Sequence, residues 1–171
     1  MYGARVGIAA RLLLKDPQAM KYSDFQLLEG MNTAVGMIYR ALGRAFSSLA
    51  RRRATLIPVD GSADLPEDFW SFVRMERTDG ADEYEGWEME GNQVLSSLPS
   101  LELVYYRVPL RINSLNDDID AAEVLFDDIA AITVLCVEGS LPAAEERART
   151  AAGQVAQRRD WGTLPERRGW R

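Results

Sequence analysis

Paired carboxylates are the residues of this chain whose types and spacing could support chemistry. They occur as Glu67-Asp68, Asp117-Asp118 and Asp127-Asp128. Carboxylates that converge on one pocket can act as a general acid and base or bind Mg²⁺. Adjacent residues of a strand or helix point away from one another, so helix capping and solubility explain these pairs better. A divalent-cation site between Asp117 and Asp128 is the one feature of the sequence that could support an enzymatic function.

Composition excludes most other catalytic and metal chemistry. The chain has no histidine, and its one cysteine, Cys136, lies in the apolar run 129–137. A Ser-His-Asp triad, a Cys-His dyad, a His/Cys zinc site and an intramolecular disulfide are therefore impossible. No glycine-rich phosphate loop occurs, and Ser47-Ser48 and Ser96-Ser97 have no accompanying base. We expect Cys136 to be a small buried hydrophobic residue, and we expect no enzymatic activity, no metal and no cofactor.

The C-terminal residues combine tryptophan and arginine without any periodic pattern. Both residue types are favoured at the centres of protein interfaces. We therefore predict that residues 159–171 form an extended C-terminal arm that orders on a partner by coupled binding and folding. The alternative is a terminus packed loosely on its own domain. The residues of the predicted binding arm are Arg158, Arg159, Trp161, Leu164, Arg167, Arg168, Trp170 and Arg171.

Length and composition predict a single globular domain before this arm, over residues 1–158. The chain of 171 residues has the size of one domain, and its 47% hydrophobic and 27% charged residues match the globular average. No apolar stretch reaches the length of a membrane span, and the N-terminus lacks a signal-peptide pattern. We therefore expect a soluble intracellular protein.

Charge is divided into blocks along the chain. The total is −6, but residues 1–53 sum to +6, residues 60–90 to −9 and residues 158–171 to +3. A dedicated nucleic-acid binder is normally basic overall with its positive charge on one face, so this pattern disfavours that class. Blocks of opposite sign suit contacts between copies of one chain or with a protein partner, or they are ordinary solvated surface.

Four helices are predicted from hydrophobic periodicity and from start and stop signals. Their ranges are 6–14, 24–43, 117–138 and 142–158. The second is the clearest, because Ser23 and Gln26 form a capping-box pattern ahead of an apolar stripe that Phe46 and Leu49 could extend. The predicted core residues of the bundle are Leu28, Met31, Val35, Ile38, Ile129 and Ile132.

Between the second and third helices the pattern becomes that of an antiparallel β insertion over residues 54–109. Strands are predicted over 54–59, 72–77, 87–90, 93–95 and 101–109. Gly91-Asn92 joins two of these strands in a tight hairpin. We expect an α+β fold consisting of a mainly α-helical bundle with a small antiparallel β insertion and the extended C-terminal arm.

Four segments carry a resemblance to a known family. They are KYSDFQLLEGMNTAVGMIYRA (21–41), LPEDFWSFVRM (65–75), WEMEGNQV with LELVYYRVP (87–94 and 101–109), and DDIDAAEVLFDDIAAITVLCVEG (117–139). In their order and spacing, over about residues 6–138, the chain resembles the head-to-tail adaptor (connector) proteins of tailed bacteriophages. The acidic segment 79–90 and Arg51–Arg53, where a less charged turn is expected, depart from that pattern.

The resemblance implies a structural virion protein. Copies of the chain would form a ring of about twelve subunits beneath the portal protein, with the arm on the portal and the lower face on the tail or a stopper protein. DNA would pass through the channel without specific binding, and no membrane would be involved. The protein would assemble in the host cytoplasm and reside in the virion at the head-tail connector.

A second class of function stays open at this point, a non-enzymatic regulatory α+β module that binds a protein or a nucleic acid. Salt sensitivity distinguishes nucleic-acid binding from the adaptor interpretation. Contacts with phosphates weaken steeply as salt rises because counterions are released, whereas an interface centred on tryptophan does not.

Overall fold

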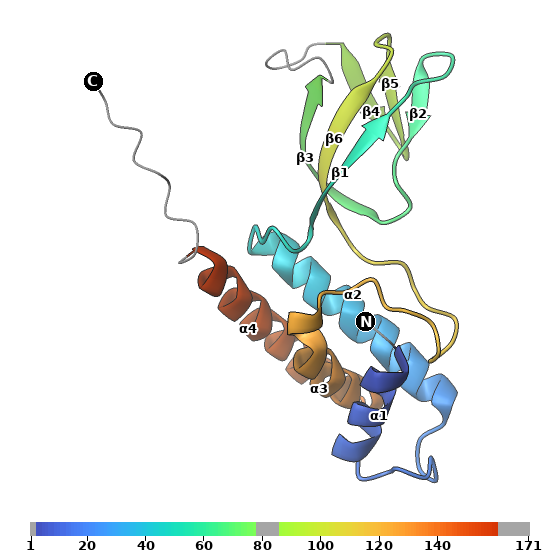
Figure 1. Cartoon of the computed structure of the whole chain (residues 1–171), viewed down its shortest axis with the longest axis vertical. Coiled ribbons are helices and arrows are strands. Elements are labelled where there is room, and N and C mark those ends of the chain that lie inside the picture. Colours follow the sequence, from blue (N-terminus) through green and yellow to red (C-terminus); the bar gives the residue numbers. More distant parts are fainter. Residues whose placement is uncertain (1–2, 78–85, 161–171) are drawn as a thin grey trace, which may run out of the picture.

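The computed structural model describes residues 3–77 and 86–160. The molecule has a helical body and a β head, which we define as residues 51–107 and which is inserted between the second and third helices (Figure 1). The body consists of α1 (Gly3–Leu13), α2 (Asp24–Arg44), the short 3-10 turn η1 (Glu123–Leu125), α3 (Phe126–Val137) and α4 (Leu141–Asp160).

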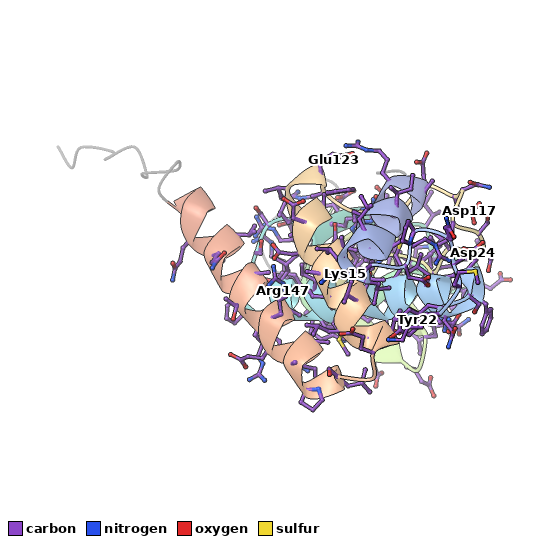
Figure 2. The ribbon with its side chains drawn as sticks, turned by 90° about the horizontal axis from the view of Figure 1, so that it is seen from below. Lys15, Tyr22, Asp24, Asp117, Glu123 and Arg147 are labelled. Atoms are coloured by element: carbon purple, nitrogen blue, oxygen red, sulfur yellow. The ribbon has the colours of Figure 1, made fainter. Side chains whose placement is uncertain are left out.

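The helical body is built around the contact between α2 and α3. Gly30 of α2 allows a close approach, because a Cβ atom there would lie 2.7 Å from Cγ2 of Val137. In both views α1 and α4 lie on opposite sides of α3 (Figures 1 and 2). Five of the six predicted core residues are buried and Leu28 is partly buried against the same cluster. The buried five are Met31, Val35, Ile38, Ile129 and Ile132.

The β head contains two three-stranded antiparallel sheets. Its strands are β1 (Arg51–Leu56), β2 (Ser62–Asp64), β3 (Phe69–Arg77), β4 (Trp87–Glu90), β5 (Gln93–Ser96) and β6 (Leu101–Arg107). One sheet has the order β1-β6-β3 and the other β2-β5-β4. Side chains from both sheets meet in a hydrophobic core that is separate from the core of the helical body, with Leu103 and Val94 at its centre.

The predicted fold class is wrong in its proportions. The structure is α+β with four helices and two sheets, with 44% helix and 23% strand, and it is not a mainly helical bundle with a small insertion. The physical reason is the separate core of the β head, since three-stranded sheets with a buried face need their own apolar packing. Sequence periodicity detected most of the strands but not the way in which they pack into two layers.

The third helix also begins later than the predicted residue 117, at Phe126 after η1. Asp117 does not cap a helix, because its carboxylate accepts hydrogen bonds from the backbone N–H groups of Asn113 and Ser114 at 3.0 and 2.9 Å. Asp120 binds Arg107 of the β head. These acids are therefore used by the preceding segment and by a tertiary contact.

Several boundaries in and around the β head differ from the prediction. The first strand begins at Arg51, so the arginines expected in a turn pair with β6 along the ladder. The three-residue strand β2 was not predicted, and β6 ends at Arg107 rather than at Pro109. The apolar stripe of α2 does not continue to Phe46, because the helix ends at Arg44.

Candidate interaction surfaces

The carboxylates of residues 117–128 do not form one site. Asp117 closes its own turn, Asp120 binds Arg107, and Asp128 accepts a hydrogen bond from Arg147 at 3.3 Å. Across residues 3–77 and 86–160, no group of three or more His, Cys, Asp and Glu side chains is placed to hold a metal ion. The carboxylates that the sequence singled out therefore stabilise loops and ion pairs, and the surfaces of the molecule become the relevant candidates.

Cys136, expected to be a small buried hydrophobic residue, is partly buried on α3 and packs against the core of the helical body. Desolvation raises the pKa of its thiol to about 11. Because the thiolate is the reactive form, this cysteine is a poor nucleophile at neutral pH. It contributes to packing, in agreement with the hydrophobic role expected of it.

An ionic junction joins the β head to the helical body. At its centre the side chain of Arg107 is only 8% exposed and donates two hydrogen bonds to the carboxylate of Asp120. Arg52 also binds Asp120, at 2.6 Å, and lies 3.5 Å from Asp68. The hydroxyl of Tyr105 donates to Asp68 at 2.7 Å. Arg107 and Asp68 are the least exposed charged side chains of this network, whereas those of Asp120 and Arg52 are 58% and 43% exposed. The network fixes geometry because removing a partner of Arg107 leaves its buried charge unpaired.

The junction reaches α2 through Tyr39. The hydroxyl oxygen of Tyr39 accepts a hydrogen bond from the backbone N–H of Ala122 at 3.1 Å, and the guanidinium of Arg107 lies 5.3 Å from the centroid of the Tyr39 ring. The hydrogen bond from Arg107 holds the pKa of Asp120 below its ordinary value. The second half of α2, the β head and the segment before α3 are thus held together by one set of contacts.

A groove of about 530 Å³ lies between α1, the first turn of α2 and residues 113–116. Ile8 and Phe25 line it and are 62% and 70% exposed, and Leu115 lines it as well. Leu12, one turn after Ile8 on α1, is also exposed. Scattered exposed apolar residues are normal, but apolar side chains that share one concave surface indicate a binding site. We call this feature the α1–α2 groove.

The charged residues that line the α1–α2 groove are Arg11 and Asp24, which form an ion pair at 2.5 Å. Asp117 directly follows the groove-lining segment, is exposed and makes no ion pair with a described residue. Figure 2 shows Asp24 and Asp117 on the same side of the helical body, with Arg147 of α4 on the other side. The groove therefore suits a partner that presents an apolar side chain, with a positive charge placed to reach Asp117.

The opposite end of α2 presents such a side chain. Phe46 has a left-handed backbone conformation with φ 55° and is 81% exposed. Its N–H donates to the carbonyl of Gly43 at 3.0 Å, and the N–H of Ser47 donates to the carbonyl of Leu42 at 2.9 Å. These two bonds define a Schellman motif, in which the left-handed position is usually glycine. The Phe46 side chain has only an edge contact with the ring of Tyr106, with ring centroids 6.5 Å apart.

Two arginines precede Phe46 on the last turns of α2. Arg40 and Arg44 are exposed and line a shallow groove between α2 and α4 together with Glu145 and Arg149. They make no ion pair within 4.0 Å with a described residue. Like charges four residues apart on a helix repel one another. We call Phe46 with Arg40 and Arg44 the Phe46 end of α2.

The predicted binding arm falls almost entirely outside the described residues. Helix α4 continues to Asp160, so Arg158 and Arg159 belong to its last turn. Helix α4 ends on the side of the body away from α1 (Figure 1). The arm residues outside the described range are Trp161, Leu164, Arg167, Arg168, Trp170 and Arg171.

Sequence reasoning missed both ends of α2 as surfaces. Phe46 was interpreted as a continuation of the apolar stripe, although it lies three residues after Gly43, where a helix of this length can end. The usable signal was the Arg40 and Arg44 spacing, which places two like charges on one face just before an aromatic residue. The α1–α2 groove had no signal, because residues 113–116 reach it only through tertiary structure.

None of the described helices combines the length and apolar character that crossing a membrane requires. Comparison of the chain with protein-family models and with curated proteins gives no match.

Proposed function

We propose that this chain is the repeating subunit of a head-to-tail adaptor ring, which joins the portal protein of a tailed bacteriophage to its tail or stopper protein. One observation carries the proposal: the two ends of α2 present different exposed surfaces, an apolar groove with the exposed Asp117 beside it and an exposed aromatic residue beside two arginines. Contacts between two different patches generate rings when the rotation closes, whereas a twofold dimer needs one self-complementary patch.

The ionic junction supports this role. Copies in a closed ring have to share one conformation, since small differences in the angle between the two parts would accumulate around the ring. Arg107, Asp120 and Tyr39 tie the β head to α2 through buried and charge-assisted contacts. These contacts would give every subunit the same angle between the β head and the helical body.

The arm supplies the contact with the portal in this proposal. Trp161 and Trp170 would be buried in portal pockets, and Arg167 and Arg168 would bind its acidic groups, as tryptophan and arginine do at interface centres. Helix α4 ends on the side of the body away from α1 (Figure 1), and α1 lines the α1–α2 groove. Subunit contacts and portal contacts can then use separate surfaces.

DNA would pass through the ring without specific binding. The net charge of the chain is −6, and a channel lined with carboxylates repels phosphates. A protein that bound DNA tightly would slow its passage. The negative net charge of the chain is therefore compatible with a channel through which DNA moves.

The test combines the purified chain with the portal ring of the phage that encodes it, using the full chain and a variant that lacks residues 160–171. We expect the full chain to sediment with the portal, and the truncated chain to stay in solution with an unchanged circular dichroism spectrum. A control substitution on the β head, Ile57→Lys, should leave portal binding intact because Ile57 lies on neither end of α2.

Two results would overturn parts of this proposal. Unchanged portal binding by the truncated chain would remove the arm from the portal contact. No association of the folded full chain would favour a regulatory module instead, and binding of duplex DNA that weakens steeply with salt would assign that module to nucleic acid.

A further inference from the structure

We propose that Phe46 of one copy inserts into the α1–α2 groove of the next copy, so that successive α2 helices follow one another head to tail. This inference rests on the proposed ring and adds the contact that closes it. The partner is a second copy of this chain, and the contact is an aromatic side chain in an apolar groove between surfaces of opposite charge.

The combination of backbone and side chain at Phe46 needs an explanation that its own chain does not supply. Lys15 ends α1 with the same φ of 55° and the same two hydrogen bonds, but its long side chain is charged, whereas Phe46 places a large apolar side chain in this conformation. The same motif ends α3, where the left-handed residue is Gly139 with φ 79°. Phenylalanine at this position therefore carries a conformational cost and leaves a large apolar side chain 81% exposed. Burial in another molecule would offset both.

The α1–α2 groove suits an aromatic side chain. Its volume of about 530 Å³ lies within the range of roughly 300–1,000 Å³ that is typical of ligand clefts. Ile8 and Phe25 provide exposed apolar walls. Leu115, in the segment before α3, lines the groove as well. Aromatic side chains prefer edge-to-face or offset contacts with other rings, which Phe25 offers to an incoming Phe46.

Charge complementarity selects the same pairing. Arg40 and Arg44 accompany Phe46 and make no ion pair with a described residue. Asp24 at the α1–α2 groove is paired with Arg11, whereas Asp117 beside the groove is exposed and makes no ion pair with a described residue. Insertion of Phe46 would bring the arginines of one copy near Asp117 of the next, which relieves part of the repulsion between the arginines. It would also place the negative end of one helix dipole near the positive end of the next.

The contact has to join two copies. The groove and Phe46 lie at opposite ends of α2, which spans roughly 30 Å for its 21 residues at about 1.5 Å each. Phe46 therefore cannot reach the α1–α2 groove of its own chain. Because the two patches differ, each copy offers one of each to its neighbours, and the contact propagates until the ring closes.

The decisive experiment is disulfide cross-linking of a paired-cysteine variant. Ser48→Cys, two residues after Phe46, and Asn116→Cys, in the lining of the groove, are both exposed positions that leave Phe46 and Phe25 in place. They are combined with Cys136→Ser, which removes the native thiol, and the protein is oxidised both alone and after mixing with the portal ring. We expect a ladder of oligomers from the paired variant. Each single variant should give no ladder, because a head-to-tail contact brings residue 48 near residue 116 and not near itself. The matched control, Asn116→Cys with Ile57→Cys, should give no ladder.

The outcomes separate this inference from the proposed function. Portal binding with a ladder supports both. Portal binding without a ladder contradicts the Phe46 contact and leaves the adaptor role. A ladder from protein that does not bind the portal supports the contact and contradicts the adaptor role, and the loss of both contradicts both. A ladder of equal strength from the control pair would also overturn the contact.

A second variant distinguishes binding from a structural role. Phe46→Gly should weaken the assembly that the wild type forms by roughly 10- to 150-fold, the loss expected for one buried phenylalanine, while the melting temperature stays the same or rises. The matched control Ile57→Gly removes an apolar side chain of similar exposure from the β head and should leave assembly unchanged. A lowered melting temperature with unchanged assembly would show that Phe46 serves only the fold.

Discussion

The C-terminal ends of α2 and α3 have the same backbone architecture and opposite side-chain choices. Both close with the two hydrogen bonds of a Schellman motif, and in both the residue after the cap has a positive φ. That residue is Gly139 in α3 and Phe46 in α2. The end of α3 has glycine at the left-handed position, as a Schellman motif usually does. The end of α2 has instead a phenylalanine whose side chain is largely exposed.

The difference indicates that the C-terminal end of α2 is less stable locally than the C-terminal end of α3. Local choices in a natural sequence normally agree with the fold, and departures occur mainly at functional sites. The Phe46 end of α2 combines such a departure with two like charges, Arg40 and Arg44, on one face. Four stability measurements on three variants follow. Two test the junction that holds α2 against the β head, and two test how far the two helix ends differ.

The largest effect is expected from Asp120→Asn, which disrupts this junction. The substitution leaves the buried guanidinium of Arg107 without its main carboxylate partner, and should lower the free energy of unfolding by about 1–3 kcal/mol. The free energy is measured by urea denaturation at neutral pH. A loss below the experimental error would show that the junction does not hold the head in place.

The same variant should change the dependence of stability on pH. The hydrogen bond from Arg107 lowers the pKa of Asp120 below its ordinary value of 3.8. A lowered carboxyl pKa stabilises the fold fully above the ordinary value and loses that contribution as pH falls through the lowered one. Wild type should therefore lose part of its advantage over Asp120→Asn below about pH 4. A constant difference between pH 7 and pH 3 would contradict the assignment.

A smaller effect on the free energy of unfolding is expected from Gly139→Phe, which places the phenylalanine of the α2 end at the corresponding position of α3. A Cβ at Gly139 would meet no heavy atom within 4 Å, so Gly139→Phe tests the left-handed backbone without a clash. The free energy of unfolding should fall by about 1–2 kcal/mol. Thermal unfolding followed by circular dichroism measures it, and Ser140→Ala serves as a neighbouring control. A neutral result would mean that the conformation carries no cost in this protein.

The smallest effect is expected from the reverse substitution, Phe46→Gly. Glycine accepts the left-handed conformation, and the lost side chain has little contact with its own chain, so stability should rise by about 0.5–1 kcal/mol. The same thermal unfolding measurement applies, at a concentration where the wild type is not assembled. A fall in stability would indicate that the contact of Phe46 with Tyr106 outweighs the backbone cost.

The start of α2 could be predicted from sequence because its signals are local. The Ser23 and Gln26 pattern specifies two hydrogen bonds, and the structure has both, from the Gln26 N–H to Ser23 Oγ and from the Ser23 N–H to Gln26 Oε1. The hairpin at Gly91 is local in the same way, with φ 61° at the turn. Capping and turn chemistry depend on a few neighbouring residues.

The features that sequence did not reveal depend on distant partners. Asp120 has the sequence context of a helix cap, but Arg107 of the β head binds it and the helix starts later. The second sheet of the β head could not be predicted because β2 has only three residues. The α1–α2 groove combines three segments that only tertiary structure brings together, so no single segment indicates it.

The measurement that tests the central claim most directly is the mass of the complex that the full chain forms with the portal ring. Native mass spectrometry of the mixture should show one copy of this chain per portal subunit, and Phe46→Gly should give partly filled rings under the same conditions. No complex between the portal and folded protein, or a copy number unrelated to the symmetry of the portal, would contradict the proposal that this chain is an adaptor subunit.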